Sequence, residues 1–129
     1  MILGIGTDLV QVARMQHLWE RHGARLRERL LHPVELPDLP STEPAGFLAR
    51  RFAAKEALAK ALGCGIGEDM ALAEAGVTHD ARGRPEFVLA GRARRTAERL
   101  GVATIHLSIS DEREYAQAFV IVEAAGRPE

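Results

Sequence analysis

The sequence predicts a single α+β domain in which a small antiparallel sheet packs against helices. Three observations favour this class: apolar, strand-like stretches near both ends of the chain, a long alanine-rich helical pattern in the middle, and a further pair of short strand-like stretches after it. Segregated rather than strictly alternating strand and helix patterns are typical of α+β domains. The length of 129 residues is that of one domain, so we take 1–129 as a single unit.

The N-terminal third is expected to hold one strand and one interrupted helix. Ile2 to Val10 is short and apolar, and we interpret it as a buried strand with Asp8 near its end. Val12 to Leu31 has helical periodicity, which Gly23 is expected to break into two pieces. Four prolines exclude a regular helix throughout the following segment, 32–44.

The remainder of the chain contains two helical patterns and two pairs of strand-like stretches. A helix is predicted over 45–62, with Gly63 as its C-terminal stop and a flexible glycine loop over 63–67. We then expect a hairpin of Ala73–Thr78 and Pro85–Leu89, a helix over Gly91–Leu100, and a second strand pair, Val102–Ser110 and Tyr115–Val122.

Composition and charge exclude several functional classes. Seventeen basic and eighteen acidic residues give a net charge of −1, which argues against sequence-independent nucleic-acid binding. The single cysteine, Cys64, excludes an internal disulfide and fits a reducing compartment. The sequence contains neither an apolar run of about 18 residues nor a signal-peptide pattern. We therefore expect a cytoplasmic protein with no membrane span.

Lysine is rare in this chain, and its placement is informative. Of the seventeen basic residues only Lys55 and Lys60 are lysines, and both fall in the central helix. Lysine is a compact point charge that can release a proton, whereas arginine is a larger fork that stays charged. In an arginine-rich chain the two lysines therefore mark positions that need this chemistry. Coincidence, or two sites too tight for a guanidinium, is the alternative.

Two carboxylates are candidates for reaction chemistry. Asp8 is either the cap of the following helix or a carboxylate that meets a positive charge at the strand end. Glu56 and Lys60 are four residues apart and share a helix face, either as an ordinary exposed pair or as the lining of a partly buried cleft. Mg²⁺ is typically held by one or two carboxylates together with substrate phosphate oxygens. Asp8 and Glu56 are such a pair if the fold brings them together.

Other polar groups suggest binding rather than catalysis. Arg14, Arg21 and Arg25 are spaced to lie on nearly one line of a helix, either as a solvated face or as a docking strip for an acidic partner. The glycine loop follows a helix and lacks a Gly-Lys-Ser/Thr ending, so it is not a Walker A loop. The five histidines lack metal-ligand spacing, and no pattern suggests covalent catalysis.

Three motifs resemble those of one enzyme family, the holo-[acyl-carrier-protein] synthases, which are small phosphopantetheinyl transferases. The motifs are Gly4-Ile5-Gly6-Thr7-Asp8-Leu9-Val10 with Arg14, then Arg51-Phe52-Ala53-Ala54-Lys55-Glu56-Ala57 continuing to Lys60-Ala61-Leu62-Gly63, and finally Ser108-Ile109-Ser110-Asp111-Glu112 with Tyr115-Ala116 and Val120-Ile121-Val122-Glu123. The resemblance covers nearly the whole chain in the right order, and only the proline-rich segment 32–44 is unmatched.

The resemblance implies both an activity and an assembly. A member of this family transfers 4′-phosphopantetheine from coenzyme A to a serine of an apo acyl carrier protein and releases adenosine 3′,5′-bisphosphate. The implied cofactor is Mg²⁺, the implied pathway is fatty acid biosynthesis, and the implied assembly is a homotrimer with active sites between subunits. The implied fold is α+β.

The resemblance also assigns roles to individual residues. It places the metal ligands at Asp8 and Glu56, and the catalytic groups at Glu56 and Lys60. It implies coenzyme A contacts at Lys55, Lys60, Gly63, Gly65 and Ser110. The arginines that meet the acidic carrier are implied to be Arg14 and Arg21, and the helical spacing adds Arg25 to this carrier-binding set.

Two departures and two alternative functions stay open at this stage. Asp111 stands where many members have histidine, and Cys64 replaces a threonine common in the glycine loop. A metal-dependent pyrophosphate hydrolase and a non-catalytic trimeric binding module are the alternatives. The sequence does not distinguish a fatty-acid carrier from a polyketide carrier as the acceptor.

Overall fold

The structure is a computed structural model and describes residues 1–126. Five strands, three α-helices and two 3₁₀ helices (η1 and η2) follow one another in these residues. In chain order they are β1 (Ile2–Gln11), α1 (Val12–Leu30), η1 (Pro33–Asp38), α2 (Ala45–Leu62), η2 (Leu72–Glu74), β2 (Ala75–His79), β3 (Pro85–Leu89), α3 (Gly91–Leu100), β4 (Val102–Asp111) and β5 (Tyr115–Ala124). The predicted α+β class is confirmed, with the sheet residues divided between two antiparallel sheets.

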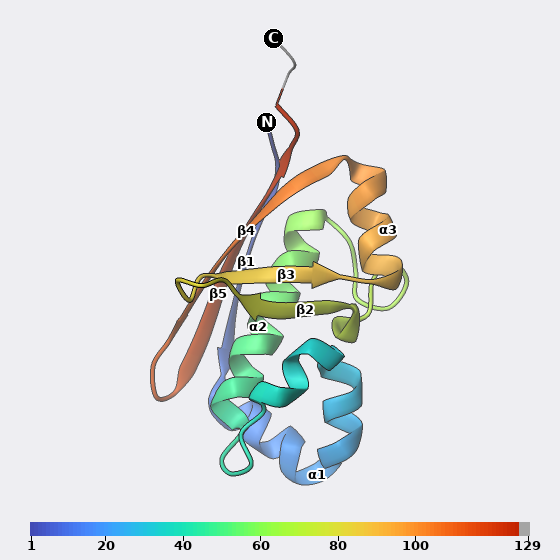
Figure 1. Ribbon diagram of the computed structural model, residues 1–129. Helices are drawn as coiled ribbons and strands as arrows, with labels where there is room; N and C mark the ends of the chain where they lie inside the picture. Colours follow the sequence, from blue (N-terminus) through green and yellow to red (C-terminus); the bar gives the residue numbers. More distant parts are fainter. Residues whose placement is uncertain (127–129) are drawn as a thin grey trace.

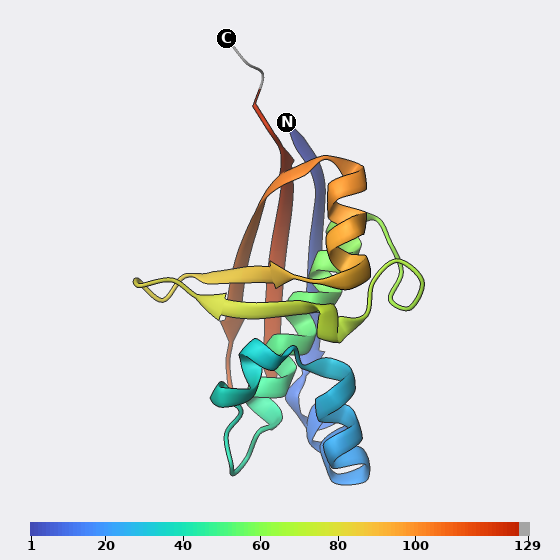
Figure 2. The same cartoon turned by 45° about the vertical axis from the view of Figure 1, so that its right-hand side comes forward.

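The two sheets enclose the central helix. Strands β1, β5 and β4 form one sheet in that order, and β2 and β3 form a separate hairpin. Helix α2 runs along one face of the three-stranded sheet, and the β2–β3 hairpin crosses it on the other side (Figures 1 and 2). The core therefore surrounds α2, whose apolar side chains are buried on almost every side.

Two glycines allow α2 to lie unusually close to β1. A Cβ atom built on Gly4 would lie 1.8 Å from the carbonyl oxygen of Ala61, and one on Gly6 would lie 1.9 Å from that of Ala57. Either contact is impossible for a real side chain, so this part of β1 has to be glycine. The close approach brings the C-terminal half of α2 beside Asp8, the next residue on the same face of the strand.

The prediction that Ile2–Val10 is a buried strand is wrong for one of its faces. β1 is an edge strand, and the side chains of Leu3, Ile5 and Leu9 are exposed on the sheet face opposite α2. Only the alternate residues, which end with Asp8 and Val10, face the helix. The first hairpin strand also begins two residues later than expected, because residues 72–74 form the 3₁₀ helix η2.

The other element ends agree closely with the sequence analysis. Gly23 interrupts α1 with non-helical backbone angles, and Gly63 and Gly101 end α2 and α3 in the left-handed conformation. Within 33–38 the proline-rich segment is a 3₁₀ helix rather than an α-helix. None of the helices in the described chain is long and apolar enough to span a membrane.

Candidate active site

Asp8 and Lys60 meet where β1 passes the last turns of α2. The Lys60 ammonium donates hydrogen bonds to Asp8 Oδ1 at 3.0 Å and to the Thr7 carbonyl oxygen at 2.9 Å. The N-cap of α1 is Gln11, and no side-chain hydrogen bond caps that helix. The alternative reading of Asp8 as a helix cap is therefore wrong, and this carboxylate meets a positive charge instead.

Glu56 belongs to the same group, because the charges of Asp8 and Lys60 both act on the pKa of its carboxyl. Burial raises the pKa of the Glu56 carboxyl above its ordinary value, and the negative charge of Asp8 raises it further. The positive charges of Lys60 and Arg14 partly offset this shift. We call Asp8, Glu56 and Lys60 the surface cluster. The fold thus brings together all three residues that the sequence nominated for metal binding and catalysis.

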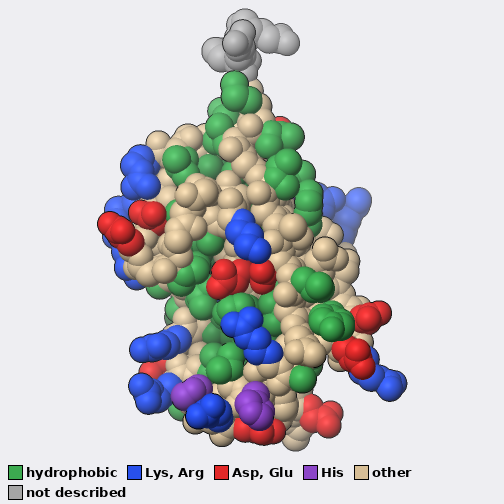
Figure 3. All heavy atoms as spheres, turned by 180° about the vertical axis from the view of Figure 1, so that it is seen from behind, with side chains coloured by type: hydrophobic (Ala, Val, Ile, Leu, Met, Phe, Trp, Pro, Cys, Tyr) green, Lys and Arg blue, Asp and Glu red, His purple; other side chains and the backbone are tan. Residues whose placement is uncertain are grey.

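Arg14 lies at the border of the surface cluster. Its guanidinium carbon is 5.6 Å from the centre of the Phe52 ring, one helical turn before Glu56 on α2. On the face seen in Figure 3, acidic side chains lie near the middle, with basic side chains above and below them. The arrangement alternates charge over a solvent-accessible surface and suits a ligand that carries several phosphate groups.

Lys55 does not belong to the surface cluster, although it precedes Glu56 in the chain. Its side chain is fully buried, and the ammonium contacts Glu35 Oε1 at 2.6 Å and the carbonyl oxygen of Leu30. Arg51 Nε lies 3.2 Å from the other oxygen of Glu35. The expected contact between Lys55 and coenzyme A is therefore corrected: an ammonium buried on this side of α2 does not reach a ligand at the surface cluster.

Glu35, Arg51 and Lys55 form what we call the buried cluster. This cluster attaches the proline-rich segment to α2. Glu35 Oε1 also accepts the backbone N–H of His32, so one carboxylate holds η1 against α2. Lys55 joins the end of α1 to the same point through Leu30. Burial lowers the pKa of Lys55 to about 8, against the opposing charge of Glu35. Sequence reasoning missed Glu35, because its partners lie on another element.

The predicted arginine line holds for only part of α1. Arg14 and Arg21 lie before the interruption at Gly23, whose φ of 38° and ψ of −108° are non-helical, and Arg25 lies after it. The helical phase does not continue through Gly23, so the prediction that Arg25 extends the line is wrong. Arg25 instead lines a shallow groove of about 280 Å³ at the kink, with its other walls formed by Leu18, His22, Leu26 and Arg29.

The remaining coenzyme A candidates lie in two places. Gly63 and Gly65 follow the end of α2 and are exposed, and the Gly63 N–H is 3.1 Å from the Lys60 carbonyl oxygen, so this loop begins beside the surface cluster. Ser110 stands in a row with Gln117 and Leu9 on the outer face of the three-stranded sheet. Asp8 faces the other side of that sheet, so one chain does not bring Ser110 to the surface cluster.

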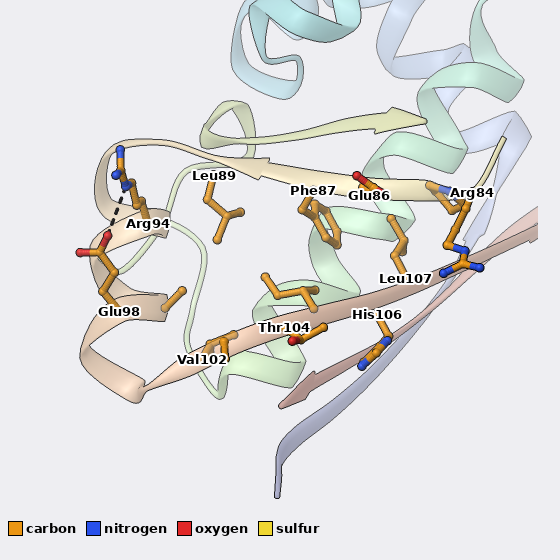
Figure 4. A pocket seen from close by; sticks show the side chains of 14 residues that line it. Arg84, Glu86, Phe87, Leu89, Arg94, Glu98, Val102, Thr104, His106 and Leu107 are labelled. Carbon is orange, nitrogen blue, oxygen red and sulfur yellow. Dashed lines mark hydrogen bonds and ion pairs between the residues drawn. The ribbon is translucent and has the colours of Figure 1, made fainter. Parts of the chain in front are cut away.

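One cavity is separate from the surface cluster. It has a volume of about 810 Å³ and lies between β3, α3 and β4. Figure 4 shows Arg84 and Phe87 of β3 and its turn facing Thr104 and His106 of β4. The sequence analysis did not single out His106, because a cavity between elements leaves no pattern along the chain.

The donor set of the surface cluster fits Mg²⁺ better than a transition metal. Within residues 1–126 there is no group of three or more histidine, cysteine or acidic side chains that would hold an ion by itself. Asp8 and Glu56 supply two carboxylates, and after burial the charge of Asp8 is the next cause that raises the pKa of Glu56. Two carboxylates with the rest of the coordination left to water and phosphate oxygens is the usual arrangement for Mg²⁺.

The two departures from the family pattern have local partners or surroundings. Asp111 Oδ2 lies 3.4 Å from the Arg50 guanidinium, so this carboxylate connects the end of β4 to α2. Cys64 is half-buried, and burial raises the pKa of its thiol, which disfavours the reactive thiolate. Neither residue adds a group to the surface cluster.

Comparisons with known proteins agree in both sequence and structure. The family model of the 4′-phosphopantetheinyl transferase superfamily matches residues 4–120. A holo-[acyl-carrier-protein] synthase of Alkalilimnicola ehrlichii is 54% identical over 127 residues, which cover 97% of this chain and 99% of the relative. The crystal structure of the Neisseria meningitidis synthase is 42% identical, with a TM-score of 0.88 over 95% of this chain and 99% of that one. A Helicobacter pylori synthase in complex with coenzyme A is 28% identical, with a TM-score of 0.80 over 92% of this chain and 99% of that one.

Proposed function

The chain belongs to the 4′-phosphopantetheinyl transferase superfamily as an enzyme of the holo-[acyl-carrier-protein] synthase type, and from this premise we propose how it works. Residues 1–129 act as one domain that transfers 4′-phosphopantetheine from coenzyme A to a serine of an apo acyl carrier protein, in a Mg²⁺-dependent reaction. Adenosine 3′,5′-bisphosphate is the second product. The observation that carries the proposal is the surface cluster, in which Asp8, Glu56 and Lys60 converge from two elements.

Asp8 and Glu56 would hold the Mg²⁺. When bound there, the ion neutralises the charge that develops on the pyrophosphate oxygens during phosphoryl transfer. Burial raises the pKa of Glu56 and the negative charge of Asp8 raises it further. A cation between the two carboxylates would relieve the second of these effects, which supports the assignment.

Glu56 acts on the attacking serine, and Lys60 acts on the leaving group. The Glu56 carboxylate accepts the proton of the carrier serine as the serine oxygen attacks phosphorus. The Lys60 ammonium donates a hydrogen bond to Asp8 in the free enzyme. During the reaction it turns towards the departing bisphosphate and neutralises its negative charge. Its side chain is 54% exposed, so this change of partner needs no opening of the core.

The carrier is proposed to dock on α1. Arg14 stands beside the surface cluster, and Arg21 lies on the same helical piece, so cations extend outward from the reacting groups. Beyond the kink, the groove at Arg25 offers apolar walls with a basic rim. Such a surface fits an acidic protein that inserts an apolar side chain and pairs its carboxylates with arginine.

We further propose that the active enzyme is a homotrimer with its sites between subunits. The outer face of the three-stranded sheet exposes large apolar side chains from two strands, among them Ile5, Leu9, Tyr115 and Phe119. A patch of this kind is typical of an interaction site. Assembly through it would also place Ser110, which lies on that face, near a neighbouring surface cluster. Gly63, Gly65 and Lys60 supply the remaining coenzyme A contacts from one chain.

The acceptor is proposed to be the carrier of fatty acid biosynthesis, and the location cytoplasmic. Both statements rest on family membership. The relative kcat/KM for a fatty-acid carrier and a polyketide carrier, measured side by side, tests the first of them.

The deciding experiment is the mass of an apo carrier protein after incubation with this enzyme, coenzyme A and Mg²⁺. We expect the carrier to gain the mass of phosphopantetheine, and Glu56→Gln or removal of Mg²⁺ by a chelator to prevent the gain. A parallel incubation without carrier tests the hydrolase alternative. Release of adenosine 3′,5′-bisphosphate there, with no gain of carrier mass in the first arm, would contradict the proposal.

A further inference from the structure

The loop that follows α2 is fastened to α3 by side chains. Thr96 Oγ1 of α3 donates a hydrogen bond of 2.7 Å to the Asp69 carbonyl oxygen, and Thr96 is only 2% exposed. The Arg92 guanidinium donates to the Gly67 carbonyl oxygen, and that of Arg99 lies 3.9 Å from the Asp69 carboxylate. Residues 67–69 therefore take their position from α3 rather than from α2, the helix they follow.

The start of α3 is itself held by Glu74. Its carboxylate accepts the backbone N–H of Ala71 at 2.7 Å and that of Arg92 at 3.0 Å. Burial by itself would raise the pKa of Glu74, but these hydrogen bonds and the charge of Arg92 lower it, so the carboxylate stays ionised. A Cβ atom on Gly91 would lie 2.2 Å from a Glu74 oxygen, so α3 begins in direct contact with this group. Glu74 thus holds both the end of the loop, at Ala71, and the start of α3, at Arg92.

Only a short stretch separates this anchor from the surface cluster. At its other end the loop is fixed by the N–H of Cys64, which donates to the Ala59 carbonyl oxygen at 3.0 Å. Gly65 and Ile66 span the gap between the two anchors, both are exposed, and no atom lies within 4 Å of a Cβ built on Gly65. Because glycine accepts many backbone conformations, the path of this stretch depends on where residues 67–69 are held.

We propose that Thr96 and Arg92 are positioning residues for coenzyme A: they hold the exposed backbone at Gly63–Ile66 in the conformation that binds the nucleotide beside Lys60. This inference rests on the proposed function, which assigns coenzyme A contacts to Gly63 and Gly65. Neither positioning residue needs to touch the ligand. They act through the Gly67 and Asp69 carbonyl oxygens, whose hydrogen bonds fix the loop before the ligand arrives.

The test compares three variants of α3 in steady-state kinetics. Thr96→Val keeps the shape of the side chain but removes the hydroxyl, and it should raise the KM for coenzyme A by about fivefold or more because the loop loses a buried hydrogen bond. The KM for the carrier and kcat should stay within about twofold. Thr96→Ser, which keeps the hydroxyl, should recover most of the affinity. Arg94→Ala, on the exposed side of α3, is the matched control and should change nothing.

A second measurement, made without any substrate, tests whether Thr96 holds the loop. Backbone hydrogen exchange over 63–70 should be faster in Thr96→Val than in the wild type, and Thr96→Ser should restore protection. If Thr96→Val fails to fold, Arg92→Gln, at a partly exposed position, takes its place in both measurements.

The outcomes separate this inference from the proposed function. Failure of the wild type to modify any carrier would overturn the proposed function, while hydrogen exchange would still report on the loop. A working wild type, together with an unchanged KM for coenzyme A in Thr96→Val and Arg92→Gln, would overturn the inference alone. Equal increases in both KM values would overturn it as well, because they would show a general disturbance of the site.

Discussion

Helix α2 carries two lysines five residues apart, and they serve two clusters of opposite character. In the buried cluster, Lys55 and Glu35 are 2.6 Å apart and both side chains are 0% exposed. In the surface cluster, Lys60 and Asp8 are 3.0 Å apart, with side chains 54% and 17% exposed. A lysine of α2 therefore pairs with a carboxylate of another element once in the core and once in contact with solvent.

The difference in burial determines what each pair can do. An ammonium in the core cannot leave its carboxylate without leaving an unpaired buried charge, which is strongly destabilising. An ammonium at the surface gains little from its partner and can exchange it for a substrate phosphate at small cost. The buried cluster thus stabilises the arrangement of α1, η1 and α2, whereas the surface cluster is available for the reaction.

The largest effect is expected from breaking the buried cluster. Lys55→Met should lower the free energy of unfolding by about 3–5 kcal/mol, because Glu35 would keep its buried charge with only Arg51 nearby. Lys60→Met is the matched control and should change stability by less than about 1 kcal/mol. Urea unfolding of the two variants makes the comparison. Similar stability losses in both would show that burial does not distinguish the clusters.

The next effect concerns the carboxylates of the surface cluster. Asp8→Asn and Glu56→Gln should each reduce kcat by about 100-fold or more, equivalent to at least about 2.7 kcal/mol of transition-state stabilisation, and leave the fold intact. Rates are measured at limiting and at saturating Mg²⁺. Near-normal transfer by either variant at limiting Mg²⁺ would refute the assignment of that residue as a metal ligand.

A charge-conserving change should have a smaller effect. Lys60→Arg is expected to slow transfer about tenfold or more, or at least about 1.4 kcal/mol, because the guanidinium is larger and does not release a proton. Lys55→Arg should be milder in the rate per folded molecule, since Lys55 faces the core, and its cost should fall on stability instead. Full activity in Lys60→Arg would mean that any fixed cation is sufficient at this position.

Charge reversal on α1 should act on one substrate only. Arg14→Glu is expected to raise the KM for the carrier several-fold and to leave the KM for coenzyme A nearly unchanged. Because the Debye length is about 8 Å at physiological ionic strength, added salt should weaken carrier binding by the wild type more than by this variant. Arg94→Glu on α3 is the control for a general charge effect. An equal change in both KM values would exclude docking at Arg14.

The smallest expected effect is a titration shift. In metal-free protein, nuclear magnetic resonance of the Glu56 carboxyl should give a pKa above its ordinary value, from burial and from the charge of Asp8. The deprotonated form that accepts the serine proton is therefore lost at a higher pH than for an ordinary glutamate, as acidity increases. Asp8→Asn should lower this pKa, and saturating Mg²⁺ should lower it as well. No response to Mg²⁺ would place the ion elsewhere.

Local signals in the sequence were sufficient for most element boundaries. Gly63 and Gly101 end helices through their own left-handed backbone, and the bounds of α2 and α3 were predicted to the residue. The outer face of β1 was not predicted, because the usual pattern is reversed there. Glycines occupy the face that packs on α2, and large apolar side chains occupy the exposed face.

The residues of the two clusters could be assigned only from the tertiary structure. Helix α2 carries alanine or leucine on almost every side. Periodicity therefore gave no polar face that could assign Lys55 to the core and Lys60 to the surface. Glu35 reaches Lys55 from a 3₁₀ helix twenty residues earlier, a distance over which no spacing rule applies. The angles at Gly23 likewise set the direction of Arg25, and the sequence indicated only that a break would occur there.

The transfer rate per folded molecule, measured for Lys60→Met and Lys55→Met in one assay with saturating coenzyme A, carrier and Mg²⁺, tests the division between the two clusters most directly. We expect Lys60→Met to lose at least about tenfold in kcat while it keeps wild-type stability, and Lys55→Met to keep kcat within about threefold despite its lower stability. A wild-type kcat in Lys60→Met, or a larger loss in Lys55→Met than in Lys60→Met, would contradict this division.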